Sequence, residues 1–327
     1  MLPTPEAPHA GRFIEQQIKA LRRAGLELNV LLVNREKNGM GVYTSLPAAL
    51  RKAVDQFKPD LVHVMYGGIM SRIASAVIHD RPVMVTFHGS DLLGQRVKDP
   101  LRRVLSALGV LASKQAARRC EGIVAVAEHL VERLPQYISS SKVRVIPCGI
   151  DLDLFKPLDR ALCRKQLGWE HDGFHVLFQS TGDPIKRPEL AAAAVECLRK
   201  LGVKTDLHYL CGIEYEQVPI WINASDVLLV TSRHEGSPTI VKEALACNLP
   251  IVSVPVGDIP QRIQGLEGCH LAAPDALDLA QKLLQVRMQP VQIAGRATVH
   301  SASSEHSAKR LVEFYEHVIG RRKGMKP

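Results

Sequence analysis

The stretch HEGSPTIVKEALACNLPIVS, residues 234–253, contains the pattern that decides the fold. Ser237 and Pro238 are typical of a helix N-cap and first helical position, and apolar residues then recur at helical spacing from Ile240 to Leu245. Short apolar runs precede and follow this helix, as the strands of a parallel sheet do. The stretch therefore predicts a helix that begins at the carboxyl edge of a parallel sheet, where such sheets bind ligands.

Two glutamates flank the predicted helix start. Glu235 lies in the loop before the helix, and Glu243 lies about two turns inside it. The free N–H groups and the positive end of the helix dipole favour an anion at this position. A carboxylate such as Glu243 can accept hydrogen bonds from both hydroxyls of a diol, which suggests a ribose.

Two neighbouring segments carry related features. Lys186 and Arg187 follow the first apolar run of the second half, and Gly257 precedes a further predicted helix start. All of these segments are expected at the same edge of one sheet. Helix starts and cations that converge there favour a diphosphate.

The alternation of short apolar runs with amphipathic stretches extends over the whole chain. Such runs predict strands that are buried on both faces, and therefore two doubly wound α/β domains. The predicted strands lie within residues 26–33, 60–66, 81–89, 122–127 and 143–147, then 174–180, 205–212, 226–232 and 249–256.

Proline and glycine residues in PCGIDLDLFKPLDR, residues 147–160, mark a connector between the two halves. We expect an N-terminal domain over 1–151 and a C-terminal domain over 152–303. A terminal helix and basic tail should occupy 304–327, with the helix stopping near Gly320.

Composition limits the class of protein. The 327 residues are 46% hydrophobic and 23% charged, as in a soluble globular protein, and no apolar run is long enough to span a bilayer. The start of the chain lacks a secretion signal, so we expect a cytoplasmic protein. The seven cysteines are scattered and odd in number, which disfavours disulfides and zinc frameworks.

The net charge is +9, which implies an anionic partner such as nucleic acid, anionic lipid or a phosphorylated substrate. Nucleic-acid binding is disfavoured, because aromatic residues make up only 5% of the chain and no groove-reading motif is present.

The sequence resembles glycosyltransferase family 4. The resemblance spans both halves and is carried by VTFHGSD (85–91), VRVIPCGIDLDLF (143–155), ASDVLLVTSRHEGSPTIVKEALACNLPIV (224–252) and, more weakly, PHAGRFIEQQIKALRRAG (8–25). It implies the GT-B architecture, in which two Rossmann-like domains face a cleft that holds a nucleotide sugar.

The resemblance also assigns site residues by position. Glu243 is similar to the family glutamate that binds the ribose, and Glu235 to the one that lies against the donor sugar at the reaction centre. His88 is similar to a histidine that faces the transferred sugar, and Gly11 to a glycine near the diphosphate. The loop whose amides contact sugar and phosphate corresponds to Gly236, Ser237, Pro238 and Thr239. The remaining donor-binding positions are the cations Lys186 and Arg187.

The chain departs from the family pattern at several positions. Ser180 and Thr181 replace the usual Gly-Arg, and Cys148 stands where asparagine is common. Asn248 replaces a common glycine and suits a left-handed turn. The family opens on a strand central to the first sheet, whereas this chain begins in the loop after it. We therefore expect that first strand to be missing, through truncation or a start codon assigned too late.

The activity that the resemblance implies is retaining transfer of a sugar from a nucleoside-diphosphate sugar to an acceptor hydroxyl. A UDP-sugar is the favoured donor, and a saccharide or a lipid-linked sugar of polysaccharide, lipopolysaccharide or glycolipid synthesis the acceptor. No cofactor or metal is expected, because Asp151 and Asp153 lie in the connector and no other Asp-x-Asp pair follows a strand. Two alternatives stay open, namely a sugar-nucleotide 2-epimerase and a non-catalytic sugar-nucleotide-binding protein.

Residues 96–119 contain seven cations and the single acid Asp99. A basic amphipathic helix of this kind can lie on anionic lipid, at the inner face of the cell membrane. The alternative is a solvated helix whose leucine and valine side chains pack on the sheet.

Overall fold

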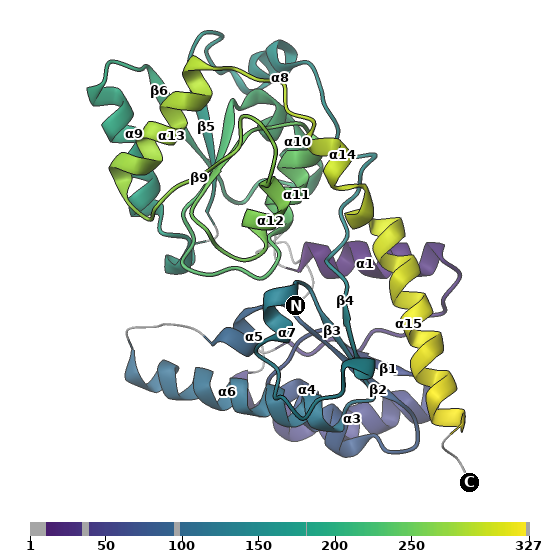
Figure 1. Ribbon diagram of the computed structural model, residues 1–327. Coiled ribbons are helices and arrows are strands. Elements are labelled where there is room, and N and C mark those ends of the chain that lie inside the picture. Colours follow the sequence, from purple (N-terminus) through teal and green to yellow (C-terminus); the bar gives the residue numbers. More distant parts are fainter. Residues whose placement is uncertain (1–10, 35–38, 95–98, 181, 325–327) are drawn as a thin grey trace. The chain divides into compact units, whose positions relative to one another are not determined.

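The computed structural model describes residues 11–34, 39–94, 99–180 and 182–324 (Figure 1). Thr181 and two cations of the 96–119 stretch, Arg96 and Lys98, lie outside these ranges, as do residues 1–10, where the chain is expected to begin in a loop. The chain divides into two compact units. Unit 1 comprises Ile14–Cys148 and the C-terminal helix from Glu305, and unit 2 comprises Gly149–Ser304 together with Arg12 and Phe13.

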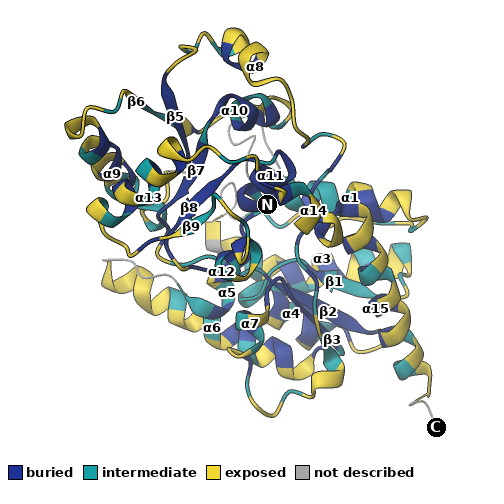
Figure 2. Ribbon diagram, turned by 45° about the horizontal axis from the view of Figure 1, so that its top comes forward, coloured by how far each residue is buried: buried dark blue, intermediate teal, exposed yellow. Residues whose placement is uncertain are grey.

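Unit 1 is built on a parallel sheet in the order β1-β2-β3-β4. Its described strands are β1 (Val62–Val64), β2 (Val83–Phe87), β3 (Gly122–Ala125) and β4 (Val143–Val145). All residues of β2 and β3 are buried, which agrees with strands covered on both faces (Figure 2). Its described helices are α1 (Arg12–Arg23), α3 (Val42–Phe57), α4 (Ile69–Val77), α5 (Ser90–Leu93), α6 (Pro100–Arg119), α7 (Glu128–Val131) and α15 (Ser304–Gly324), with short 3-10 turns at Gly39–Gly41 and Ser140–Lys142.

The strand predicted over 26–33 is wrong. This segment has no regular structure, and Val30, Leu31 and Leu32 are exposed. A strand needs a partner for its N–H and C=O groups, and none of the described strands pairs with it. Its apolar residues therefore do not by themselves make it a strand.

The predicted end of the terminal helix near Gly320 is also wrong, because α15 continues to Gly324. Contacts of the last turns explain the extension. Arg321 donates to the Ser141 hydroxyl, and Arg322 forms an ion pair with Glu121 at 2.6 Å and donates to the carbonyl of His79. These contacts outweigh the cost of one glycine inside a helix, which is about 1 kcal/mol.

Unit 2 contains a second parallel sheet, in the order β6-β5-β7-β8-β9. Its described strands are β5 (Phe174–Gln179), β6 (Thr205–Leu210), β7 (Val227–Val230), β8 (Ile251–Ser253) and β9 (His270–Leu271). No apolar run predicts β9, which has only two residues. The other strands lie where the apolar runs predict them.

Helices surround this second sheet on both faces, and the core between them is a continuous cluster of buried apolar residues. The described helices are α8 (Arg160–Leu167), α9 (Pro188–Lys200), α10 (Val218–Ala224), α11 (Thr239–Ala246), α12 (Ile259–Ile263), α13 (Ala276–Met288) and α14 (Gly295–Thr298), with 3-10 turns at Pro184–Lys186, Tyr215–Gln217 and His300–Ala302. Asn248 has φ 57°, which confirms the predicted left-handed turn after α11.

An arginine of unit 2 binds carbonyls of the connector after β4. The Arg296 guanidinium donates to the carbonyls of Leu152 and Phe155 in the connector and of Ala246 at the end of α11. Phe155 itself is completely buried. The connector is thus an ordered part of unit 2 that adjoins the C-terminal end of α11.

Candidate functional site

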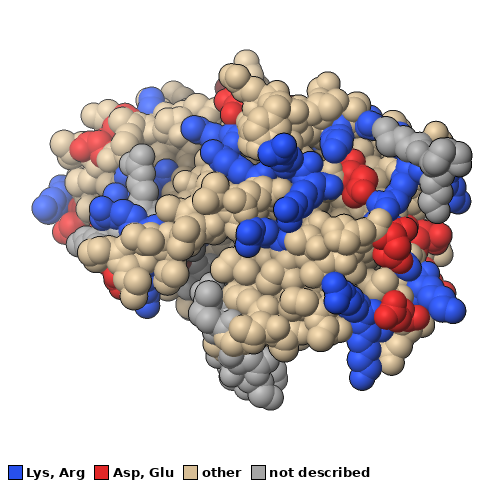
Figure 3. Space-filling model, turned by 90° about the horizontal axis from the view of Figure 1, so that it is seen from below, with Lys and Arg blue, Asp and Glu red and all other residues tan. Residues whose placement is uncertain are grey.

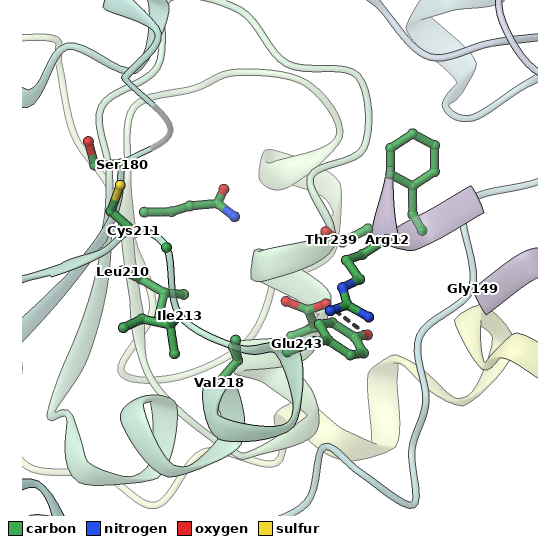
Figure 4. A pocket seen from close by; sticks show the side chains of 13 residues that line it. Arg12, Gly149, Ser180, Leu210, Cys211, Ile213, Val218, Thr239 and Glu243 are labelled. Atoms are coloured by element: carbon green, nitrogen blue, oxygen red, sulfur yellow. Dashed lines mark hydrogen bonds between the residues drawn. The ribbon is translucent and has the colours of Figure 1, made fainter. Parts of the chain in front are cut away.

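A pocket opens within unit 2 at the carboxyl ends of β5 and β6 and at the start of α11 (Figure 4). Its cavity volume is about 90 Å³. Its lining residues come from α1, the connector, the ends of β5 and β6, the turn after β6, and α10 and α11: Arg12, Phe13, Gly149, Gln179, Ser180, Leu210, Cys211, Gly212, Ile213, Tyr215, Val218, Thr239 and Glu243.

Thr239 and Glu243 form the α11 side of this pocket. They are four residues apart on the same face of the helix, Thr239 at its start and Glu243 one turn further on. Figure 4 shows the side chains of Arg12 and Glu243 close to each other at one end of the pocket. The Arg12 guanidinium lies 5.8 Å from the centre of the Tyr215 ring and 3.7 Å from the Glu214 carboxylate.

Glu243 has a buried carboxyl that accepts a hydrogen bond from Tyr215. Its side chain is 5% exposed, and the Tyr215 hydroxyl donates to Oε1 over 3.4 Å. Burial raises the pKa of Glu243 to about 7, while Lys242 and the Tyr215 hydroxyl partly oppose this rise. Burial and the neighbouring Glu243 also raise the pKa of Tyr215, so its hydroxyl keeps the proton that it donates. The carboxyl of Glu243 therefore changes protonation near neutral pH.

The start of α11 differs from the prediction in detail. The helix begins at Thr239, Pro238 occupies the N-cap position, and no side chain caps the helix. The Ser237 hydroxyl instead accepts from the Lys242 ammonium at 3.2 Å and from Arg262 at 3.3 Å. Lys242 is completely buried, so its ammonium needs acceptors more than the first helical N–H groups do.

Lys186 and Glu235 form a close ion pair beside the pocket. The Lys186 ammonium lies 2.6 Å from Glu235 Oε1 and donates over 3.4 Å to the side chain of Gln179, which lines the pocket. Both side chains of the pair are about one-sixth exposed, at 16% and 15%. Arg187 is used differently, because its guanidinium donates to the carbonyls of Thr231 and Ser232.

The loop after β8 packs against the loop that contains Glu235. Gly257 has φ 61°, and a β-carbon there would lie 2.8 Å from the carbonyl oxygen of Gly236 and 3.0 Å from Glu235 Cβ. Only a glycine leaves room for this approach. Two residues later α12 begins, and Arg262 at its far end forms an ion pair with Asp258 at 2.7 Å.

His88 lies in unit 1, directly after β2. The Asp91 carboxylate accepts from the backbone N–H groups of His88 and Gly89, which fixes the turn. The imidazole Nδ1 is 3.6 Å from the Cys148 sulfur, and the Tyr66 ring lies 4.7 Å away. Burial alone would lower the pKa of His88, but Cys148 and Asp91 outweigh it and raise the pKa above its ordinary value.

The structure brings part of the predicted site together. Thr239 and Glu243 line the pocket, and the Lys186–Glu235 pair adjoins it through Gln179. Gly236, Ser237 and Pro238 form the buried loop before α11, and Gly11 immediately precedes Arg12. Arg187 binds backbone carbonyls instead of reaching the pocket.

Several residues at or beside the pocket escaped prediction from the sequence, and four of them have polar side chains that bear on ligand binding. Two of these residues have a signal in the sequence. Arg12 directly follows Gly11, and Arg262 follows Gly257 by about one helical turn. Gln179 ends the predicted strand before Ser180 and could also have been found. Tyr215 has no local signal, because only the folding of the chain after β6 places its hydroxyl at Glu243.

Two family profiles match this chain. The profile of Glycosyltransferase Family 4 matches residues 10–154, and that of Glycosyl transferases group 1 matches residues 161–288. Together they cover both units. None of the described helices has the length and apolar content that crossing a bilayer requires.

Among curated relatives, D-inositol 3-phosphate glycosyltransferase of Geodermatophilus obscurus is 24% identical over a 300-residue alignment that covers 80% of this chain and 62% of that protein. The enzyme of the same name from Mycobacterium leprae (strain TN) is 27% identical over a 214-residue alignment that covers 55% of this chain and 50% of that protein. The chain thus spans about half to two thirds of the length of these relatives.

Solved structures show the same fold at low sequence identity. Sucrose-phosphate synthase from Thermosynechococcus elongatus superposes with a TM-score of 0.81 and 17% identity, over 96% of this chain and 94% of that one. Anabaena HepE in complex with UDP and glucose gives a TM-score of 0.63 and 17% identity, over 94% and 89% of the two chains. The fold is therefore GT-B, with two Rossmann-like units of parallel sheet, and the chain belongs to the family 4, group 1 glycosyltransferases.

Proposed function

We propose that this protein is a retaining glycosyltransferase that moves a sugar from a nucleoside-diphosphate sugar to an acceptor hydroxyl. The observation that carries the proposal is the pocket of unit 2, where Thr239 and Glu243 line one face at the start of α11 and Arg12 lies at the same end. The UDP bound to HepE supports a UDP-sugar as donor.

The pocket suggests how the donor binds. The ribose hydroxyls donate to Glu243, and the diphosphate lies at the N-terminus of α11, where free N–H groups and the helix dipole favour anions. Arg12, Lys186 and Arg262 supply positive charge around this position. In a site partly shielded from water, such charges stabilise a departing phosphate strongly.

Glu235 and His88 are the proposed residues at the reaction centre. Glu235 lies against the transferred sugar, oriented by its ion pair with Lys186, and Gly236 to Thr239 contact sugar and phosphate through their amides. The role of His88 rests on the family resemblance of its motif and on the polar surroundings that hold its ring. The leaving phosphate helps to deprotonate the acceptor, which attacks from the same face.

Donor binding is proposed to need no metal ion, because helix N–H groups and arginine and lysine side chains neutralise the diphosphate. Turnover should therefore persist in excess chelator. A requirement for added Mg²⁺ or Mn²⁺ after chelation would contradict this part of the proposal.

The first experiment is a thermal-shift screen of nucleotide sugars, followed by transfer assays with the donor that stabilises the protein most. Glu235→Gln should lose at least 100-fold in turnover while it still binds the donor, because removing one stabilising group of a reaction centre costs this much. Glu196→Gln on α9 is the matched control and should keep full activity, since Glu196 is exposed and pairs with Arg199 of the same helix.

The outcomes separate the alternatives. A glycosylated acceptor together with free nucleoside diphosphate supports transfer, whereas an epimerised sugar would identify a 2-epimerase. A donor that binds at the pocket without turnover would identify a non-catalytic binding protein. Near-full activity of Glu235→Gln would remove Glu235 from the reaction centre.

Helix α6 supports a second proposal, that the protein docks on anionic membrane. The apolar side chains of its first three turns are not packed on the sheet, because about half or more of each is exposed: Leu101, Val104, Leu105, Leu108 and Leu111. The buried residues of α6 are confined to its C-terminal half, Ala112 to Ala117. This exposed apolar row makes the solvated-helix alternative less favourable.

The same helix is rich in positive charge. Its residues include Arg102, Arg103, Lys114, Arg118 and Arg119, and the N-cap Asp99 is the single acid among residues 99–119. Figure 3 shows a band of lysine and arginine side chains on one face of the molecule, with few acidic ones between them. An apolar row beside cations is the combination that binds at the surface of an anionic bilayer.

Vesicle binding tests this docking. The protein should bind phosphatidylglycerol vesicles, bind less as salt increases, and bind neutral phosphatidylcholine vesicles weakly. The double variant Leu105→Ser, Leu108→Ser should reduce binding at least tenfold. Leu201→Ser and Leu277→Ser, at exposed leucines of unit 2, should leave it unchanged. Binding that is equal on neutral and anionic vesicles would contradict the proposal.

A further inference from the structure

A cluster of metal-ligand side chains lies at the amino ends of β5 and β6, at the opposite end of these strands from the pocket. His175 is the second residue of β5, and Asp206 and His208 are the second and fourth residues of β6. The parallel register places His175 opposite Asp206. Residues two apart in a strand share a face, so all three side chains lie on one face of the sheet.

The ligand atoms of these side chains already converge. His175 Nδ1 is 2.8 Å from His208 Nε2 and 3.9 Å from Asp206 Oδ2, and all three atoms lie within 4.8 Å of one another. Two nitrogens bound to a tetrahedral zinc ion at about 2.0–2.1 Å are themselves about 3.3 Å apart. The imidazoles would therefore need to separate by only about half an ångström to admit an ion.

The tautomer of His175 suits a metal ligand. Its Nε2 lies 2.8 Å from the backbone carbonyl oxygen of Glu170, which can only accept, so Nε2 carries the hydrogen. The lone pair is then on Nδ1, which faces the cluster. A histidine that donates its other ring N–H to a carbonyl is the usual arrangement of a metal-binding histidine.

The surrounding residues hold the rings in place. The Trp169 ring stacks on His208 with centroids 3.5 Å apart and planes at 9°, and it lies nearly parallel to His175 at 5.1 Å. The nearby cations Arg164 and Lys204 oppose a bound ion less strongly because each is paired with a carboxylate. Arg164 pairs with Asp226 at 2.8 Å, and Lys204 pairs with Glu170.

We propose that His175, His208 and Asp206 bind one divalent transition-metal ion, with zinc as the best fit. Two imidazoles and one carboxylate are a common zinc ligand set. Water completes the tetrahedron, since Asp206 and His208 are partly exposed. On binding, the His–His hydrogen bond is lost, and the proton of His208 moves from Nε2 to Nδ1.

The ion would tie an edge strand to its neighbour. β6 is the outer strand of the sheet, and its ladder to β5 is its only strand pairing among the described residues. A metal bridge between His175 on β5 and two residues of β6 stabilises this edge. The site is thus separate from sugar transfer, and its test does not depend on the proposed activity.

Tryptophan fluorescence reports on this site specifically. The chain has two tryptophans, Trp169 and Trp221, and their rings lie 5.4 Å apart beside His208. The protein, freed of any affinity tag and stripped of metal, is titrated with ZnCl₂ and with CoCl₂. We expect a fluorescence change that saturates at one ion per chain, and visible absorption of tetrahedral cobalt with the same stoichiometry.

Three variants decide the assignment. His208→Asn and Asp206→Asn should weaken zinc binding at least tenfold, and His300→Asn, at an exposed histidine of the same unit, should bind as the wild type does. The melting temperature of the wild type and of His300→Asn should rise with zinc, and that of His208→Asn should not. Cooperative melting of each metal-free variant confirms that it is folded.

The proposal would be overturned if neither ion changed the fluorescence. It would also be overturned if neither ion bound at one per chain with a dissociation constant below about 0.1 mM. It would also be overturned if His208→Asn and Asp206→Asn bound zinc as tightly as the wild type, because the ligands would then lie elsewhere.

Discussion

Glu243 is the residue whose protonation state matters most for the pocket. Burial raises its pKa to about 7, so at neutral pH the carboxyl is divided between its neutral and ionised forms. Only the ionised form offers both oxygens to donor hydroxyls. The environment that makes Glu243 available to a ribose therefore also makes it sensitive to pH.

Affinity for a nucleotide sugar should rise with pH. If only ionised Glu243 binds the ribose, the competent fraction increases about tenfold from pH 6 to pH 8 around a pKa of about 7. Calorimetric titration with UDP-glucose measures this. A nucleotide sugar is preferable to UDP, whose terminal phosphate titrates with a second pKa of about 6.

Glu243→Gln is the control for this pH profile. The amide cannot ionise, so the variant should bind more weakly at pH 8 and show no rise between pH 6 and pH 8. A wild-type affinity that is flat over this range would show that Glu243 does not contact the ligand in its ionised form.

The same pKa makes a prediction about stability. A carboxyl whose pKa is raised on folding holds its proton in the folded state after the unfolded chain has lost it, so stability falls as pH rises. The loss should occur between the ordinary value of 4.5 and about 7 and amount to about 3 kcal/mol. Chemical denaturation of wild type and Glu243→Gln, compared at each pH, isolates this contribution because the other groups titrate in both.

Ser237 shows what residue-level reasoning missed. Ser-Pro before an apolar helical run correctly predicts that a helix starts here, to within two residues. The hydroxyl, however, accepts from Lys242 and Arg262 in place of a helical N–H. That choice depends on a buried ammonium and on a second helix, and neither is visible in the local sequence.

At the scale of elements, the two loops that follow β7 and β8 act as one support for the start of α11. Gly257 approaches the backbone of Glu235 and Gly236 so closely that a β-carbon would lie 2.8 Å from a carbonyl oxygen. The position of Glu235, and of its partner Lys186, therefore depends on the neighbouring loop.

Gly257→Ala should displace the Glu235 loop and weaken donor binding at least tenfold. The substitution combines the cost of a left-handed backbone, about 1–2 kcal/mol, with a clash that backbone movement must relieve. Gly202→Ala is matched to it, because Gly202 also has a positive φ of 81° but has open space around its β-carbon position. We expect similar loss of stability from the backbone in both variants, and loss of UDP-glucose affinity in Gly257→Ala alone. Equal affinities in the two variants would separate this loop from the site.

The segment 26–33 marks the limit of element prediction. Its composition is that of a strand, yet it forms none, because β structure requires hydrogen bonds to a partner that the local sequence does not provide. By contrast, the runs that became β2, β3, β5 and β7 are buried on both faces by helices from the same unit. Their continuous apolar character was sufficient to predict them.

At the scale of the whole molecule, the pocket belongs to one of two compact units. Its lining residues all cluster with unit 2, including Arg12 and Phe13 from the start of α1. Each unit has its own core of buried side chains, that of unit 2 around β5 and β7 and that of unit 1 around β2, β3 and α15. Ligand binding can therefore stabilise one unit selectively.

UDP-glucose should stabilise unit 2 directly. At 100 times its dissociation constant, a ligand adds about 2.7 kcal/mol to the free energy of unfolding of the part that binds it. Hydrogen exchange measures where this occurs. We expect slower exchange in β5, β7 and α11, and a smaller change in β2 and β3. Protection confined to unit 1 would place the donor outside the pocket.

The sequence by itself determined the local features of this protein. Apolar runs and the Ser-Pro helix start predicted the α/β class and all but one of the described strands, because burial on both faces leaves a continuous signature in the chain. The family motifs identified the region of Glu235 and Glu243. This was possible because the loop and the helix start that carry them are adjacent in sequence and need no distant partner.

Only the tertiary structure decided which side chains meet. Tyr215 and Glu243, Lys186 and Glu235, and His175 and His208 are 28, 49 and 33 residues apart in the chain. It also decided that the leucines of α6 are exposed and that residues 26–33 form no strand. Contacts, burial and strand pairing between distant segments depend on the packing of the whole chain, which no local pattern encodes.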